Sequence, residues 1–537
     1  MLIFFLIMQY AGVVSAQTST QSATTEQADY RARYGRADMN ISCLVSAHPA
    51  FERGLLQMHS FAWEIARESF QEAASIDPTC AMAYWGEAMS YYDGLHEHPS
   101  TEEVEAARNA LVKARNASSR TEREDAYIAA AEEIYRGYPE VDRTERDRKY
   151  SEAMRNIHTK YPEDHEAAIF HALSLLALAR RGVDDNSLQM QAAATLEPLF
   201  KILPEHPGVA HYLIHAYDDA GLQERGEAAA RRYAGIAPVL THAQHMPAHI
   251  FAGIGMWEEN NISNQGALSG DPDNYHALMY LAYGHLQLGQ RNKAGELVEQ
   301  LRNKALSAEG SRAQRRGLHS ANIWLLLETH DWDTAAEVPA YSEAALDMAE
   351  TWYVRGLGAV HIGNLSRAQD ALSALNDIIA GLDQSNDSGI AVRSQLGHIH
   401  AKQLEALIRL GERRGDEAIA LMREAVEIAD RPGVNRTQPD SGTGLPAHEV
   451  FGEILLELGQ YKEAQHEFTT ALERTPNRFW SLLGLARAAT EAGDHAMATE
   501  QYNRLLGLLA RADSGLPEVV EADLYLTVAK NPLTGDR

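Results

Sequence analysis

The sequence predicts an all-α fold, a right-handed superhelical solenoid of roughly ten stacked helical hairpins. The first observation behind this prediction is a 34-residue interval that recurs within a set of prolines and within a set of glycines. The members are Pro204, Pro238 and Pro272, and Gly221, Gly255 and Gly289. The second is that apolar residues recur at helical spacing, without the strict alternation that predicts strands. The third is the length of 537 residues, which suits repeats that contact only their neighbours better than one compact core.

The N-terminal segment is predicted to be an export signal. Residues 1–16 form an apolar run that ends in Val14-Ser15-Ala16, and small residues there suit cleavage after Ala16. The basic residues that usually precede such a run are missing. A polar linker follows at 17–29, and no later segment stays apolar for the roughly 18 residues that a membrane span requires. We therefore expect the mature protein to be periplasmic or secreted, and not transmembrane once the signal is removed.

Residues 30–204 are predicted to form the N-terminal helical repeats. Counted from Ala47, the repeat positions that favour small, aromatic and proline residues hold Gly54, Ala66, Phe70, Ala73 and Pro78. Small residues let neighbouring helices approach, and large ones fill the space between them. From 95 to 165 the pattern is looser and indicates amphipathic helices that are separated by prolines.

The rest of the chain divides by how closely it keeps the 34-residue period. Residues 205–303 hold the most regular repeats, and 304–430 continue as degenerate helical repeats. Residues 431–446 are rich in proline, glycine and polar residues, which predicts a loop. Regular repeats return in the C-terminal segment, 447–537.

The chain is acidic, with 48 Lys and Arg residues against 75 Asp and Glu residues and a net charge of −27. This balance argues against a nucleic-acid partner, because phosphate binding requires a basic surface. It suits a protein that attracts cations or basic ligands. Glu449 and Glu453 fall at groove-facing repeat positions, where they could bind such a ligand or simply face solvent.

The only two cysteines are Cys43 and Cys80. In an exported protein an even pair suggests a disulfide. The repeat alignment places both at the start of successive first helices of hairpins, which pack side by side. We expect a Cys43–Cys80 bond that fastens the N-terminal repeats, and two unrelated buried thiols are the alternative.

Two histidine pairs repeat at the 34-residue interval and form the candidate site. His211 and His215 recur as His245 and His249. Residues four apart lie one above the other on a helix face, and neighbouring helices pack about 8–10 Å apart. The four imidazoles are therefore expected to converge in the concave groove of the solenoid.

His242 and Asp218 face the same groove in the repeat alignment and are further candidate ligands. Imidazoles four residues apart are a helical metal-ligand arrangement, and imidazole selects zinc, copper or iron over calcium and magnesium. The sequence therefore predicts a transition-metal site with Zn, Cu or Fe as its ion. The alternative is that these histidines bind a peptide carboxylate or donate to the backbone.

Two sequence blocks around these histidines also carry a resemblance. HPGVAHYLIHAYD (206–218) and HAQHMPAHIF (242–251), together with the 34-residue period, resemble tetratricopeptide repeats and in particular a group of exported bacterial proteins of that superfamily. The resemblance covers most of the mature chain and extends to PNRFWSLLGLARAA (476–489). It implies an α-solenoid and a shared histidine site, and it implies no particular activity.

We therefore expect an exported repeat scaffold that binds a transition metal, and with it a small molecule or peptide, on its concave face. One alternative is a metal-dependent oxidoreductase or hydrolase, in which the bound ion activates dioxygen or water. No catalytic residue beyond the metal ligands is assigned for it. The other alternative is a metal-free platform that binds a protein partner, because helix-lined grooves commonly bind peptides.

Overall fold

The computed structural model describes residues 30–95, 99–180, 186–219, 221–385, 388–431, 434 and 444–530. The expected signal and linker, 1–29, and most of the expected loop, 431–446, lie outside these residues. The described residues form helices and no strand, which confirms the all-α solenoid. Among these helices, none combines the length and the apolar character that a membrane span needs. The chain divides into two compact units, which are taken separately below.

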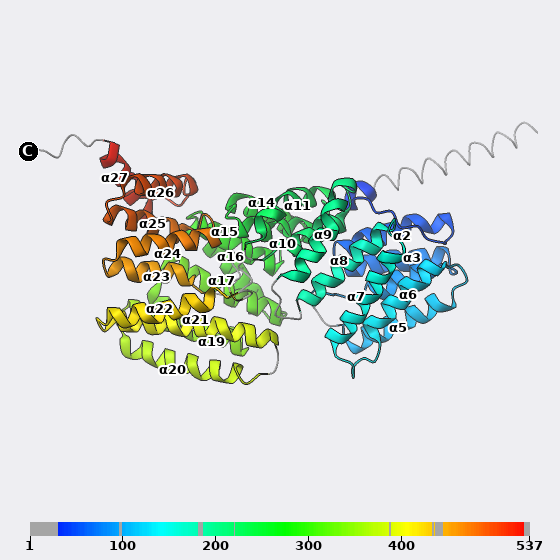
Figure 1. Ribbon diagram of the computed structural model, residues 1–537, viewed down its shortest axis with the longest axis horizontal. Helices are drawn as coiled ribbons and strands as arrows, with labels where there is room; N and C mark the ends of the chain where they lie inside the picture. The colour runs from blue at the N-terminus through cyan, green and yellow to red at the C-terminus, as the bar shows by residue number, and fades with distance from the viewer. Residues whose placement is uncertain are drawn as a thin grey trace, which may run out of the picture. The chain divides into compact units, whose positions relative to one another are not determined.

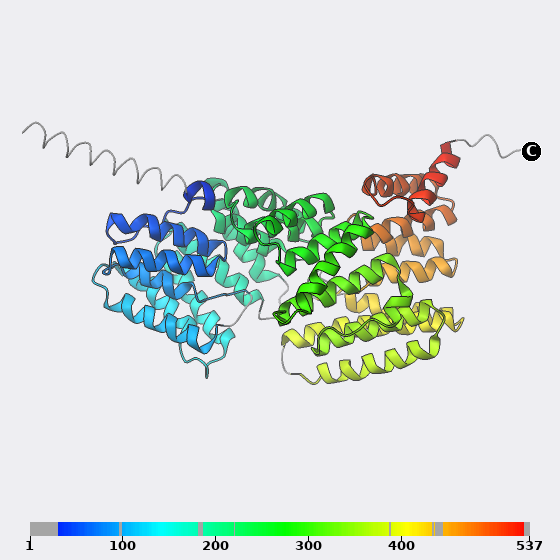
Figure 2. The same ribbon diagram turned by 180° about the vertical axis from the view of Figure 1, so that it is seen from behind.

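The first unit comprises Met1–Arg180, Ser187–Ala216 and Ala228–Met246. Its helices follow one another as antiparallel hairpins in which chain neighbours pack together (Figures 1 and 2). They are the 3-10 helix η1 (Val45–Ala47), α2 (His48–His59), α3 (Trp63–Ile76), α4 (Ala81–Met89), α5 (Thr101–Asn116), α6 (Glu122–Tyr135), α7 (Arg143–Lys160), α8 (His165–Ala179), α9 (Ser187–Ile202), most of α10 (Pro207–Tyr217) and α11 (Gln223–Ile236), and α12 (Thr241–His245).

The second unit comprises Arg181–Asn186, Tyr217–Glu227 and Pro247–Arg537. Its boundary with the first unit, between Met246 and Pro247, lies inside the segment of most regular repeats, 205–303. Its helices are α13 (Pro247–Gly253), α14 (Trp257–Gly270), α15 (Tyr275–Gln287), α16 (Arg291–Ala305), α17 (Arg312–Thr329), α18 (Trp332–Ala336), α19 (Ala345–His361), α20 (Leu365–Leu382), α21 (Ser388–Gly411), α22 (Gly415–Ala429), α23 (Ala447–Glu457), α24 (Tyr461–Arg474), α25 (Phe479–Glu491), α26 (His495–Leu508) and α27 (Pro517–Lys530).

The repeat pattern has a direct packing basis in the contact between phenylalanines and glycines. A Cβ added at Gly452 would lie 2.9 Å from the ring of Phe468, and one added at Gly484 would lie 2.3 Å from it. Phe468 on α24 is thus enclosed between α23 and α25, where only glycine leaves room for the ring. In the first unit, Phe70 on α3 packs in the same way against the glycines of α2 and α4.

The periodic glycines and prolines mark helix ends. Gly221, Gly255 and Gly289 have φ angles of +78°, +70° and +65°, the left-handed conformation that commonly ends a helix and that glycine adopts at low cost. The periodic prolines lie in the turns after α9, α11 and α14. The 34-residue interval therefore records where each hairpin turns.

The disulfide is present. Cys43 lies just before η1 and Cys80 caps the N-terminus of α4, with their Cα atoms 4.7 Å apart and a separation of 37 positions in sequence. A cross-link over a loop of this length restricts the unfolded chain, and it is worth about 3–4 kcal/mol.

Reduction of this disulfide is expected to lower the free energy of unfolding of the first unit by about 3–4 kcal/mol. The measurement is urea unfolding with and without dithiothreitol. A Cys43→Ser/Cys80→Ser double variant should match the reduced protein and should not respond to the reductant. Equal stability of the oxidised and reduced proteins would contradict the prediction.

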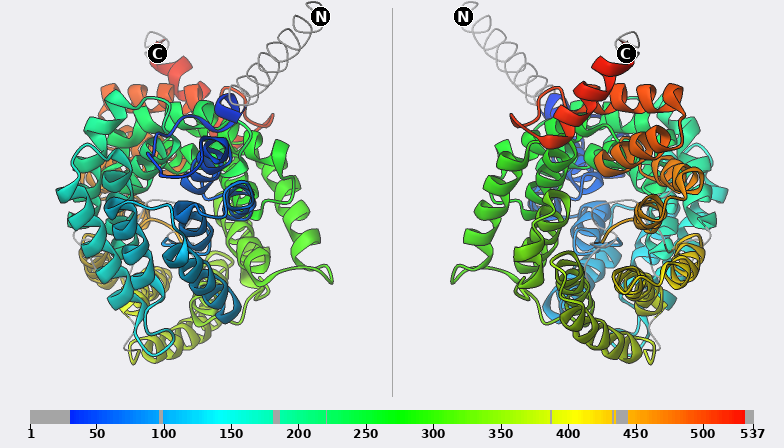
Figure 3. Two further views of the ribbon diagram at one scale, coloured as in Figure 1. Left: turned by 90° about the vertical axis from the view of Figure 1, so that its right-hand side faces the viewer. Right: turned by 90° about the vertical axis from the view of Figure 1, so that its left-hand side faces the viewer.

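The second unit closes on itself through contacts between its early and late hairpins. Trp257 Nε1 donates to the carbonyl of Asn477 at 2.9 Å, and the Asp513 amide donates to the carbonyl of Gly289 at 3.0 Å. A Cβ at Gly255 would lie only 1.9 Å from the Pro476 carbonyl oxygen, so the two turns touch backbone to backbone. In Figure 3 (right), the helices of this unit follow one another around a turn from α14–α16 (green) to α25–α27 (orange to red).

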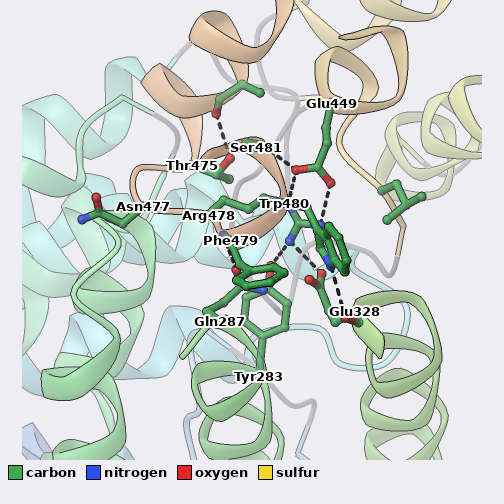
Figure 4. A network of polar contacts seen from close by, with 12 residues as sticks. Tyr283, Gln287, Glu328, Glu449, Thr475, Asn477, Arg478, Phe479, Trp480 and Ser481 are labelled. Atoms are coloured by element: carbon green, nitrogen blue, oxygen red, sulfur yellow. Dashed lines mark hydrogen bonds and ion pairs between the residues drawn. The ribbon is translucent and has the colours of Figure 1, made fainter. Parts of the chain in front are cut away.

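A buried arginine holds this closure together. The Arg478 guanidinium, 2% exposed, donates two hydrogen bonds of 2.8 Å to Glu449 and one of 2.7 Å to Glu328 (Figure 4). It also donates to the Tyr283 hydroxyl at 2.8 Å. Side chains from α15, α17 and α23 therefore meet at the turn before α25.

Candidate metal centre

Three histidines of the first unit bring their ring nitrogens together. His211 and His215 lie on α10, and His242 lies on α12. The His211 Nε2 atom is 3.1 Å from Nε2 of His215 and 2.9 Å from Nε2 of His242. Tetrahedral zinc with Zn–N bonds of 2.0–2.1 Å separates its nitrogen ligands by about 3.4 Å. The set, called here the three-histidine cluster, therefore has the dimensions of a metal site.

The orientation of His211 is set by the backbone of α2. Its Nδ1 atom lies 2.7 Å from the carbonyl oxygen of His59, which can only accept a hydrogen bond. Nδ1 therefore carries the proton, and in the neutral ring Nε2 has the lone pair. One lone pair cannot accept two well-aligned hydrogen bonds from His215 and His242, whereas a shared cation can be bound by all three Nε2 atoms. A backbone carbonyl on the far nitrogen is also the usual support of a metal-binding histidine.

Aromatic rings pack against the cluster, whose members His215 and His242 remain partly exposed. The Tyr233 ring stacks on His211 with centroids 4.9 Å apart and an angle of 12°. Phe61 lies 4.4 Å from His211, 5.7 Å from His215 and 5.4 Å from His242 between ring centroids. Its φ of +56° is uncommon for a bulky residue, and such strain concentrates at functional sites. The turn between α2 and α3 thus holds one apolar ring against all three imidazoles.

A second polar group lies behind the cluster and is complete without an ion. The His59 and His206 Nε2 atoms each donate to one oxygen of Glu166 at 2.8 Å. The Tyr212 hydroxyl donates to Nδ1 of His59 at 3.0 Å, and the Val209 amide donates to Nδ1 of His206 at 3.3 Å. Both imidazoles and the carboxylate are at most 3% exposed. Because every ring nitrogen has a partner of its own, this group supports the cluster rather than binding metal.

Burial and close contact together shift the pKa values of His59 and Glu166 in this group. Burial lowers the pKa of His59, and Glu166 only partly offsets that effect. Burial alone would raise the pKa of Glu166, but His206 and His59 outweigh it and hold that pKa far below its usual range. Glu166 is therefore an acceptor that fixes both rings, and with them the backbone at His59 to which His211 donates.

The other predicted ligands, His245, His249 and Asp218, are not members of this cluster. His245 is the last residue of α12 and is buried in the first unit. The expectation of one helix carrying His245 and His249 is not met, because Pro247 has no amide proton and α13 begins there. In the second unit, His249 Nδ1 is 2.9 Å from Asp218 Oδ2 and 3.2 Å from the Tyr280 hydroxyl. Asp218 is therefore a partner of His249.

Sequence reasoning selected the three histidines that meet in this cluster and missed most of the residues that position them. The repeat alignment placed His211, His215 and His242 in the groove. Glu166 gave no signal, because it lies 107 residues from the His59 ring that it fixes. Phe61 lies in the turn between α2 and α3, where the repeat pattern favours no particular residue type.

The family model described as tetratricopeptide repeat matches residues 445–478, the segment that holds α23 and α24. No curated protein matches the chain in sequence. Among solved structures, the chain is similar to a human IFIT1 dimer with PPP-AAAA, at 13% identity and a TM-score of 0.36, covering 87% of this chain and 92% of that one. It is also similar to the APC/C hetero-tetramer Cut9–Hcn1, at 12% identity and a TM-score of 0.30, covering 90% and 96%. The matched segment is thus a tetratricopeptide repeat within an all-α solenoid.

Proposed function

We propose that this protein is an exported repeat scaffold that binds a transition metal ion through His211, His215 and His242. The observation that carries the proposal is the meeting of three Nε2 atoms, one of them fixed as an acceptor by the His59 carbonyl. Imidazole donors favour zinc, copper or iron over calcium and magnesium. The disulfide supports export, because such bonds persist in oxidising compartments.

The bound ion joins two successive hairpins, since two ligands come from α10 and one from α12. Three protein ligands leave a coordination position for water or for a group of a small ligand or peptide. That open position also favours a second candidate function, metal-dependent hydrolysis or oxidation, which becomes testable once the ion is identified.

The test is metal uptake by untagged protein that has been stripped with a chelator and then titrated with Zn²⁺ in a calorimeter. His242→Ala is expected to weaken binding to this cluster on the order of 100-fold, because it removes a direct ligand. His211→Ala should do the same, and circular dichroism should show helical content unchanged in both. The control is His466→Ala on the exposed face of α24, which removes one histidine elsewhere and should bind as the parent does.

Equal Zn²⁺ affinity of His242→Ala and His466→Ala would contradict the proposal. So would a parent protein that takes up none of Zn²⁺, Cu²⁺ or Fe²⁺. The latter result would favour the metal-free interaction platform.

A further inference from the structure

The second unit contains a cavity of about 350 Å³, and its lining includes no residue of the three-histidine cluster. This volume is at the small end of the range for ligand pockets and suits a small molecule or one side chain. It is formed where α17 ends, α18 begins and α19 ends, facing α23 and α25. Its lining residues are His330, Trp332, His361, Leu445, Glu449, Glu453, Leu456, Glu457 and Arg487.

One side of the cavity is a column of near-parallel rings. His330 stacks on the buried Trp480 with centroids 3.7 Å apart, and Trp332 lies 4.9 Å beyond it. His361 stacks on Trp332 at 3.9 Å and 12°. His330 has a left-handed φ of +56° at the end of α17, which places its ring in the column. This wall offers flat, electron-rich surface to a ligand.

The other side is a row of carboxylates on α23. Glu449, Glu453 and Glu457 are four residues apart and therefore share one helix face. Glu449 is bound by Arg478 and by the Ser481 hydroxyl. Glu453 makes no hydrogen bond or ion pair with the described residues. When ionised it would lie one helical turn from Glu449 and one from Glu457, and like charges at that spacing destabilise a helix. A carboxyl group without a partner in the wall of a cavity is suited to a ligand that pairs with it.

The nearby cations are already neutralised. Arg478 pairs with Glu449 and Glu328, and Arg487 donates to both oxygens of Glu521 at 2.9 and 2.6 Å. Burial lowers the pKa of His330 to about 3, and it lowers that of His361 as well, so both imidazoles are neutral at pH 7. The balance of charge around the cavity is therefore negative.

We propose that this cavity binds an organic ammonium ion, with its charged group against Glu453 and its alkyl part along Trp332. Carboxylates together with aromatic faces are the surroundings in which proteins bind such cations. The ammonium group has two sources, a free polyamine or the lysine side chain of an extended peptide. The site goes beyond the metal scaffold and does not depend on it.

Binding is coupled to a proton. Burial and the neighbouring Glu449 raise the pKa of Glu453 to about 8, so in the empty cavity its carboxyl is largely protonated at pH 7. The other groups that face it are Glu457 on α23, Arg478 in the turn before α25, Arg487 on α25, Glu328 on α17, and the neutral His330 and His361. An ammonium ion favours the carboxylate and expels that proton. Affinity should therefore rise about tenfold per pH unit below pH 7 and level off above about pH 8.

The experiment is calorimetric titration at pH 6, 7, 8 and 9 with two probes, spermidine and acetyl-Gly-Lys-Gly-amide. Glu453→Gln is expected to weaken binding of the preferred probe by about 10- to 100-fold at pH 8 and to abolish the pH dependence. Glu473→Gln, on the exposed side of α24, removes the same charge and should leave both affinity and pH dependence unchanged. Preference for one probe identifies the source of the ammonium group.

Tryptophan fluorescence gives an independent readout, because a ligand along Trp332 should change its emission and Trp332→Phe should remove that change. Thermal melting of Glu453→Gln checks that the variant folds. Absence of binding by either probe to the parent protein would overturn the proposal. Equal weakening by Glu453→Gln and Glu473→Gln would overturn it too, because it would show attraction to the acidic surface only.

Discussion

Arg478→Met is expected to destabilise the second unit by about 3–5 kcal/mol, because it removes one partner from a buried ion pair. Glu449 and Glu328 would remain in the interior, 1% and 5% exposed, without the guanidinium that now donates to both. Burial already raises the pKa of Glu328, which shows how costly its ionised form is there. The Tyr283 hydroxyl would lose its donor as well.

The measurement is urea unfolding, followed by hydrogen exchange at the turn before α25. The matched control is Arg487→Met, whose side chain is 42% exposed in its pair with Glu521, so a loss of at most about 1 kcal/mol is expected. Adding Glu449→Gln and Glu328→Gln to Arg478→Met should recover part of the loss. Similar stabilities of the two methionine variants would show that Arg478 does not hold the unit closed.

Glu166→Ala is expected to destabilise the first unit by about 3–5 kcal/mol. The change leaves the Nε2–H groups of His59 and His206 buried without an acceptor, where each unsatisfied donor is costly. Glu166→Gln should cost less, because its amide oxygen can accept from one ring. Its NH₂ group would then oppose the other ring nitrogen and force that imidazole into its second tautomer.

Hydrogen exchange of α8 and α10 measures this loss in the first unit. The control is Glu132→Ala, which breaks a pair with Arg115 whose two side chains are 31% and 37% exposed, and which should cost under about 1 kcal/mol. The tautomer change in Glu166→Gln is visible in histidine ¹⁵N shifts. Wild-type exchange rates in Glu166→Ala would mean that the two imidazoles find other acceptors.

The spacing of residues in the sequence predicted the features that depend on short-range spacing, namely the helical hairpins and the residues that share one helix face. The interval between Gly221, Gly255 and Gly289 predicted repeated helical hairpins, and the structure places a left-handed glycine at each of these helix ends. The four-residue spacing of His211 and His215 predicted that their rings share a face, and the structure brings Nε2 of both together.

Contacts between residues far apart in the sequence could not be predicted from residue spacing. A proline within the second histidine block separates α12 from α13, and the helical spacing of the histidines did not predict this break. The partner of Arg478 on α17 is 150 residues away, and Asn477 bonds to Gly255 across 222 residues. Such pairings depend on how far each hairpin rotates from the last, a small angle that no residue spacing encodes and that accumulates over many repeats.

Most helical arrays have two loose termini, from which hairpins can peel away one after another. In the second unit, the backbone contact between Gly255 and Pro476 and the hydrogen bond from Asp513 to Gly289 connect the early hairpins of the array to the late ones. Peeling from the C-terminus must then break contacts with α14 and α15 at the outset, so stepwise fraying gives way to concerted opening. A protease that finds no frayed hairpin has little to cut, which would suit the export proposed above.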